Sequence, residues 1–365
     1  MNIKVDKTKI KDFDVEIYKE KCNEALDSIW EEAWLTRSVT QADKPIIADI
    51  EKTAESIRKH RKKVVIVTSG EIGKLIKAVK SILTEDEDDI QIDLIGDSVS
   101  PSDYVKVLNK INDEEFVLLA ITGKDDTLAV RSAYATMKQL LVSEVGVEKA
   151  ADDIYVVASD KNNYITRDAM QSHCKVIYYP EDTSELYCAG AEPVLLLLAV
   201  MGYDAEKYLD GFRDMLSSPE WDDDATDYSI AKAMAYKNGY EGNIIYMQRQ
   251  LEDFASWMEE AECIDSSRTV ILPDEKQKNK GKKFSTYITI EKDDNDIMMP
   301  YFEGAQGEGS LNLLMNEAGN KYFFEETKEF PGVKLSIEWL ESYNLGQFFA
   351  FIQLSNLITE FLYNN

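Results

Sequence analysis

Two strand-turn-helix units near the beginning of the chain constrain its fold most. Residues 64–79 read VVIVTSGEIGKLIKAV, and residues 116–141 begin FVLLAITGKDDT. Each unit opens with an apolar run of strand length, turns on small polar residues and continues with helical periodicity. Neither apolar run contains a charged position, which is typical of strands covered on both faces. The two units therefore predict an α/β fold with a parallel sheet at its centre.

The alternation of strands and helices continues along the chain and predicts two doubly wound domains with parallel central sheets. We expect strands at 63–68, 90–95, 116–122, 154–159 and 175–180, and weaker ones at 243–247, 269–272, 285–290 and 333–338. Helices are expected at 71–83, 101–111, 126–144, 163–171, 188–201, 205–216, 225–237 and 345–362. The predicted domains are an N-terminal helical wrap over 1–60, a first α/β domain over 61–202 and a second, shorter one over 203–365.

The charge balance argues against polyanionic partners. The chain holds 68 acidic residues against 41 Lys and Arg, a formal net charge of −27. An acidic surface repels nucleic acid and anionic membranes, so we expect neither as a partner. The four cysteines are widely separated and suggest neither a metal site nor a disulfide framework, and nothing indicates a cofactor. The N-terminus lacks the apolar core of a signal peptide, which favours a cytoplasmic protein.

Both turns carry groups that suit an anion. A strand that enters a helix through such a turn aims backbone N–H groups and hydroxyls at one point, which favours a phosphate. The candidate phosphate-binding residues are Thr68, Ser69, Gly70, Thr122, Lys124 and Thr127. The alternative is that these polar side chains only cap the helices that follow.

Two acidic residues in the second turn favour the capping alternative there. Asp125 and Asp126 stand where a phosphate would need donors. An Asp at a helix N-terminus satisfies the free N–H groups and the helix dipole, and it repels a phosphate. A metal-assisted anion site is the other interpretation of this turn, although no other motif points to a metal.

Five segments, in their order along the chain, resemble the glucose-6-phosphate isomerase family. They are VVIVTSGEIG (64–73), residues 121–141, LLLLAVMGYDAEKYLDG (195–211), LEDFASW (251–257) and SYNLGQFFAFIQLSNLITEFL (342–362). The resemblance implies two sugar-isomerase-type domains, a homodimer and an aldose-ketose conversion of a sugar phosphate by a proton shift. It also implies a C-terminal extension with a catalytic lysine, which we expect to be missing because the sequence ends at Asn365.

The resemblance implies a carboxylate base, a ring-opening histidine and a positive charge near the enediolate. The base position falls on Ile264, so Asp265 serves only if the backbone shifts by one residue; Glu303, in the Glu-Gly pair expected after the histidine, is the other candidate base. The histidine is missing from the stretch before this pair. Glu185 and Leu186 stand where an arginine is expected. The parent acid-base set is therefore absent or rebuilt.

Three functional hypotheses follow. In the first, the protein is a divergent relative that binds a sugar phosphate and has lost most or all isomerase activity. In the second, it is an active phosphosugar isomerase with a rebuilt site, in which Glu303 or Asp265 is the base and Lys124 the electrophile. In the third, it is a non-enzymatic interaction protein on the same scaffold.

Overall fold

A computed structural model describes most of the chain and divides it into two compact units. The described residues are 3–11, 13–30, 44–82, 90–111, 115–124, 126–217, 219–247, 251–262, 269–271, 281–292, 296–300, 309–326 and 328–365. One unit joins Met1–Glu32 to Lys207–Asn365, and the other is Ala33–Glu206. These limits differ from the predicted boundaries at residues 60 and 202. The division into three folding domains stays a prediction.

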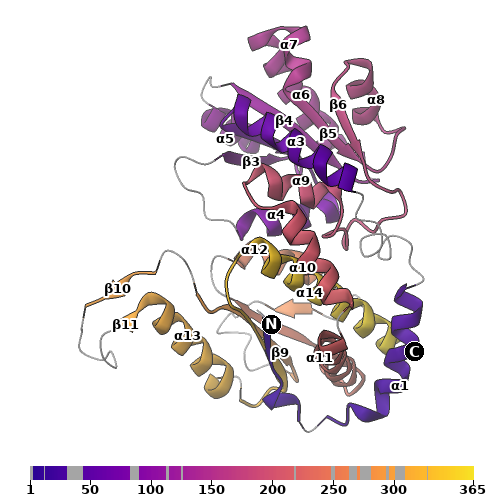
Figure 1. The fold of residues 1–365 in the computed structure, drawn as a ribbon, viewed down its shortest axis with the longest axis vertical. Helices are drawn as coiled ribbons and strands as arrows, with labels where there is room; N and C mark the ends of the chain where they lie inside the picture. Colours follow the sequence, from indigo (N-terminus) through magenta and orange to yellow (C-terminus); the bar gives the residue numbers. More distant parts are fainter. Residues whose placement is uncertain are drawn as a thin grey trace. The chain divides into compact units, whose positions relative to one another are not determined.

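The unit Ala33–Glu206 contains a five-stranded parallel sheet, in which each predicted strand is confirmed to within two residues (Figure 1). The strands are β2 (Lys63–Val67), β3 (Gln91–Ile95), β4 (Phe116–Thr122), β5 (Ile154–Ala158) and β6 (Lys175–Tyr178). Their spatial order is β3-β2-β4-β5-β6. The chain therefore moves outward from β2 to β3 and then crosses back to β4, so the strand order reverses at the β2–β4 pair.

Helices cover both faces of this sheet. They are α3 (Lys44–His60), α4 (Gly70–Ser81), α5 (Pro101–Ile111), α6 (Leu128–Val145), α7 (Val147–Asp152), α8 (Tyr164–Gln171) and α9 (Glu192–Val200). Alternate strand residues such as Val65, Leu118 and Val156 share one core cluster with α5, α6, α7 and α8. On the other face α9 packs against α3, α4 and β5. All but the first residue of α9 are buried, because its run of leucines lies between a sheet and two helices.

The second unit also has a five-stranded sheet with a mixed pattern. Its strands are β1 (Ile3–Asp6), β7 (Gly242–Met247), β8 (Thr269–Ile271), β9 (Phe284–Ile290) and β12 (Gly332–Ile337). The order is β1-β12-β9-β7-β8, in which β1 is antiparallel to β12 and the other pairs are parallel. A strand at residues 3–6 corrects the prediction of a helical N-terminus. Its pairing with β12 buries Ile3 completely.

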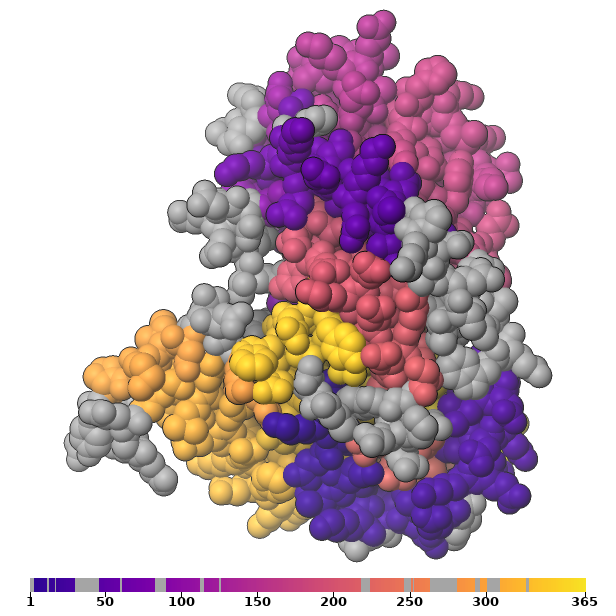
Figure 2. All heavy atoms as spheres, in the orientation of Figure 1, coloured from indigo at the N-terminus to yellow at the C-terminus, as the bar shows by residue number. Residues whose placement is uncertain are grey.

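Helix α14 (Ser342–Asn364) forms the core of the same unit. The other elements there are η1 (Thr8–Ile10), α1 (Glu16–Trp30), α10 (Ala205–Ser217), α11 (Pro219–Lys237), α12 (Glu252–Ala261), β10 (Met298–Met299), β11 (Gly309–Ser310), α13 (Leu311–Lys321) and η3 (Tyr322–Glu326). Helix α14 packs against α11 and α1, and Figures 1 and 2 show the indigo N-terminal segment beside the yellow C-terminal one. A Cβ on Gly346 would overlap the carbonyl oxygen of Tyr208, so α10 and α14 approach closely.

Candidate functional site

The strand order brings the two predicted anion turns together. In open parallel sheets, ligands bind outside the carboxyl ends of the strands where the strand order reverses. In this unit that point lies between β2 and β4, where Val67, the last residue of β2, pairs with Ala120 near the carboxyl end of β4. Thr68, Ser69 and Gly70 follow β2 directly, and Gly123 and the rest of the second turn follow β4. We call this place the switch-point crevice.

The turn after β2 places a hydroxyl without a partner among the described residues next to the first turn of α4. The Oγ1 atom of Thr68 is buried and has no hydrogen-bond partner among the described residues. Ser69 is the extended N-cap of α4, yet its side chain caps none of the N–H groups of the first turn. Gly70 has a φ of 71°, in the left-handed region that favours glycine. The side chain of Ser69 therefore does not cap α4, whose first turn also contains Glu71.

The turn after β4 is organised differently from the sequence-based expectation. Thr127, not an Asp, is the N-cap of α6, and its Oγ1 accepts the N–H of Val130 at 3.3 Å. Asp126 instead accepts the backbone N–H of Tyr164 at 2.8 Å, at the start of α8, and forms an ion pair with Arg131 at 2.9 Å. The predicted anion role of Thr127 is thus weakened, because its oxygen already serves as a cap. Asp125 lies outside the described residues.

A carboxylate from a distant loop occupies the second turn. Glu185 accepts a hydrogen bond from the backbone N–H of Lys124, one of the donors that a phosphate would use. A Cβ on Gly123 would overlap this carboxylate, so only glycine leaves room for it. The Lys124 side chain itself is exposed. Thr122 is buried with its Oγ1 accepting from Asn163 at 3.4 Å and its carbonyl from Tyr179 at 3.2 Å. The protein thus supplies its own anion to this turn.

The negative charge of Glu185 helps to raise the pKa values of neighbouring side chains. Burial, and after it the negative charge of Glu185, raises the pKa of the Cys188 thiol well above its usual range. Glu192 and Glu71 contribute in the same direction. Burial likewise raises the pKa of Tyr179. The crevice is therefore electronegative on the side of the loop after β6, which opposes binding of a dianion there.

We expect Cys188 to be inert toward alkylating reagents in the native protein. Only a thiolate attacks iodoacetamide, and the raised pKa keeps Cys188 protonated through pH 8, while its side chain is fully buried. Mass spectrometry of the peptide that contains Cys188 should show labelling in denaturant and none in the folded protein over the same time. Rapid labelling at pH 8 in the folded protein would contradict this local structure.

The two predicted catalytic carboxylates cannot be placed. Asp265 and Glu303 both lie outside the described residues. The described parts of the chain contain no cluster of three or more His, Cys, Asp and Glu side chains that could hold a metal. None of the described helices has the length and apolarity needed to cross a membrane.

The second unit contains a buried polar network that no sequence motif indicates. Lys232 Nζ in α11 lies 3.1 Å from Glu262 Oε1 and 2.9 Å from Asn356 Oδ1, and Glu262 Oε2 accepts from Asn243 at 2.8 Å. Both charged side chains are only 1% exposed. Asn243 stands at the amino end of β7, away from the carboxyl ends where ligands of such sheets bind. We assign the network to stability.

Two solved structures share the fold of this chain. The structure of a hypothetical protein from Thermus thermophilus covers 99% of this chain and 94% of its own, with a TM-score of 0.83 at 15% identity. A glucose-6-phosphate isomerase from Chlamydia trachomatis covers 99% of this chain and 84% of its own, with a TM-score of 0.76 at 11% identity. The fold is therefore that of the sugar isomerases, as predicted.

The sequence is similar to those of glucose-6-phosphate isomerases. It is 22% identical over 361 residues to the glucose-6-phosphate isomerase of Pediococcus pentosaceus. The alignment covers 88% of this chain and 80% of that enzyme. No protein-family model matches the sequence. The resemblance to glucose-6-phosphate isomerases is thus confirmed as a weak similarity that extends over most of the chain.

Proposed function

We propose that the protein binds a sugar phosphate in the switch-point crevice and has lost, or strongly reduced, the isomerase activity of its relatives. The observation that carries the proposal is the turn after β2. It combines the N-terminus of α4, which the Ser69 side chain does not cap, with the buried hydroxyl of Thr68, which has no partner among the described residues. A helix N-terminus attracts an anion through its N–H groups and its dipole, and an unsatisfied buried hydroxyl is costly until a ligand pairs with it. The similarity to glucose-6-phosphate isomerases supports a phosphosugar as that anion.

The environment of the second turn supports the loss of turnover. Conversion of an aldose to a ketose passes through an enediolate, whose negative charge must be stabilised. Glu185 stands where the resemblance implies an arginine, and its carboxylate lies against the second turn. Loss of one stabilising donor typically lowers kcat by a factor of about 100 to 1,000, and a negative charge in its place lowers it further. Similarity to the isomerases is therefore not sufficient to infer isomerase activity for this chain.

The proposal is tested by a pair of substitutions at one position. Ser69→Asp places a carboxylate at the N-cap of α4, which is a good cap but repels a phosphate, and Ser69→Asn is a neutral cap of the same shape. With saturating glucose 6-phosphate or fructose 6-phosphate, the melting temperature of the wild type should rise by a few degrees, because a ligand at 100 times its Kd stabilises by about 2.7 kcal/mol. We expect Ser69→Asn to keep most of this rise and Ser69→Asp to lose it.

The same preparations are assayed for isomerisation with a coupled dehydrogenase. Stabilisation without turnover is the expected result. Stabilisation with rapid turnover would mean that the site was rebuilt, with Lys124 and a carboxylate such as Glu303 or Asp265 as the residues to replace next. An unchanged melting temperature in millimolar ligand would contradict sugar-phosphate binding altogether and would favour the non-enzymatic interaction protein.

A further inference from the structure

The outer edge of β3 offers unpaired backbone groups. Among the described strands, β3 pairs only with β2. The N–H of Thr68 donates to Ile95 O at 3.0 Å, and the N–H of Gln91 donates to Lys62 O at 2.8 Å. Alternate residues of a parallel strand turn their backbone groups to the same side. Ile92 and Leu94 therefore direct their N–H and C=O groups away from β2, toward the open edge.

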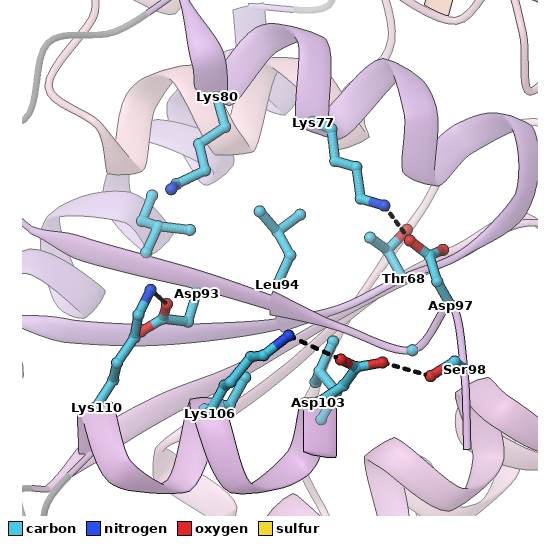
Figure 3. A pocket seen from close by; sticks show the side chains of 14 residues that line it. Thr68, Lys77, Lys80, Asp93, Leu94, Asp97, Ser98, Asp103, Lys106 and Lys110 are labelled. Carbon is cyan, nitrogen blue, oxygen red and sulfur yellow. Dashed lines mark hydrogen bonds and ion pairs between the residues drawn. The ribbon is translucent and has the colours of Figure 1, made fainter. Parts of the chain in front are cut away.

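This edge forms the floor of a groove between two helices. Figure 3 shows β3 lying between α4 and α5, whose lysine side chains extend over the strand from either side. The cavity has a volume of about 390 Å³, within the range of ligand pockets, and its lining includes residues 92–98 without a break. A second sheet edge flanked by helices would collide with the two walls. A single extended segment is narrow enough to reach the strand.

The walls of the groove carry more positive charge than the chain as a whole. Four lysines line it, against the three aspartates Asp93, Asp97 and Asp103, in a chain of net charge −27. Each aspartate forms an ion pair with one lysine, for example Lys110 with Asp93 at 2.6 Å. Ion pairs with such exposed lysines contribute about 0–1 kcal/mol, so a lysine can exchange its partner for a ligand carboxylate at small cost.

The spacing of the lysines matches an extended chain. Lys77 and Lys80 lie three residues apart on α4, and Lys106 and Lys110 lie four apart on α5. Residues at these intervals on a helix have Cβ atoms about 5–6 Å apart. Side chains on one face of a strand repeat about every 6.6 Å and alternate between the two faces. In a strand that pairs with β3, four successive acidic side chains would thus point alternately toward the lysines of α4 and those of α5.

We propose that the groove binds an extended acidic peptide, which adds a sixth strand to the sheet beside β3. The backbone groups of Ile92 and Leu94 supply the strand pairing, and the lysines select a run of about four Asp or Glu residues. The pairing gives affinity regardless of sequence, while the charge on the two walls gives specificity. The groove shares Thr68 with the sugar-phosphate turn, but peptide binding uses the β3 edge and the lysines of α4 and α5, so it can fail independently of the proposed function.

The test is a titration of the full-length protein with three labelled peptides. The first is Gly-Val-Glu-Glu-Glu-Glu-Val-Gly with blocked ends, and the second replaces its glutamates with glutamines. The third keeps the charges and carries N-methyl groups on the backbone nitrogens of its four glutamates, which removes the N–H donors of the segment that would pair with β3. We expect saturable binding of the first peptide, with the other two about tenfold weaker or worse. The single variants Lys77→Glu and Lys106→Glu should each weaken binding several-fold, whereas Lys149→Glu in α7 makes the same change in net charge outside the groove and should bind as the wild type does.

The outcomes separate the competing explanations. Equal binding of the glutamine peptide would overturn the role of charge. Equal binding of the N-methylated peptide would overturn strand formation, because it would show a polyanion attached only by its charge. Failure of all three peptides to bind at millimolar concentration, in a protein whose circular dichroism is native, would overturn the proposal. Loss of binding in Lys149→Glu would show that the interaction is not confined to the groove.

Discussion

Replacing Lys232 with methionine should destabilise the protein by about 3–5 kcal/mol, the usual consequence of removing one partner of a buried ion pair. Lys232→Met leaves the carboxylate of Glu262 in the core, where only Asn243 still donates to it among the partners described above. The side chain of Glu262 is 1% exposed, so water cannot compensate for the lost charge. The free energy of unfolding, obtained from urea titration followed by circular dichroism, measures the effect.

A double variant serves as the control for this prediction. Lys232→Met combined with Glu262→Gln contains no buried charge, so it should regain a large part of the stability lost by the single change. The coupling energy between the two positions is the quantity of interest. Destabilisation caused by altered packing would be additive in the double variant, whereas destabilisation caused by an unpaired charge would be partly reversed. A double variant that is as unstable as the sum of its single changes would contradict a buried ion pair at this place.

The pair should also affect the pH dependence of stability. Burial lowers the pKa of Lys232 from the usual lysine value of 10.5, and the charge of Glu262 only partly opposes this. The unfolded chain therefore binds more protons than the folded one between the folded pKa and 10.5. Stability from this group rises with pH across that interval and is lost as the pH falls through the folded pKa. Lys232→Met should lack this contribution.

Replacing Glu185 with glutamine should strengthen the binding of a sugar phosphate by about 10- to 100-fold. Two unit charges 4 Å apart repel by about 4 kcal/mol at an effective dielectric constant of 20, and exposure to solvent reduces this figure. Glutamine removes the charge, and it releases the N–H of Lys124 or holds it with a weaker, neutral bond. Titration calorimetry with fructose 6-phosphate measures the change in Kd directly.

The exposed residue Glu181, in the same loop, provides the matched control. Glu181→Gln makes the same change in net charge and should leave the Kd within about a factor of two, because solvent screens an exposed charge. If Glu185→Gln bound the ligand no better than the wild type, its carboxylate would not be the competitor that we infer. The two variants also separate a local effect from the influence of the strongly negative chain as a whole.

Much of the fold could be predicted because its signals are local. Residues 64–67 of β2 and 116–121 of β4 are apolar without a break, and all of them are buried. Strand β1 was missed, since a four-residue strand gives little periodicity and its partner β12 lies more than 300 residues away in the sequence. Short α7 and the helix α13 were missed for a similar reason: neither has an apolar run long enough to stand out from a polar segment.

The candidate site was predictable in its position and not in its details. The turns after β2 and β4 could be assigned to one crevice because parallel strands end on the same side of a sheet. The contact of Glu185 with Lys124 joins residues 61 positions apart, and no local pattern specifies it. The choice of Thr127 rather than a neighbouring Asp as the helix cap depends on a shift of one residue, which propensities do not resolve. The Lys232–Glu262 pair could not be predicted either, since the sequence does not distinguish a buried lysine from an exposed one.

The most direct measurement is phosphorus NMR of glucose 6-phosphate mixed with the protein. Binding broadens or shifts the phosphate resonance, and any fructose 6-phosphate formed appears as a separate signal in the same tube. We predict a saturable change with the wild type, none with Ser69→Asp, and no product signal over hours. An unperturbed phosphate resonance at millimolar protein and ligand would contradict binding, and a steady growth of the fructose 6-phosphate signal would contradict the loss of activity.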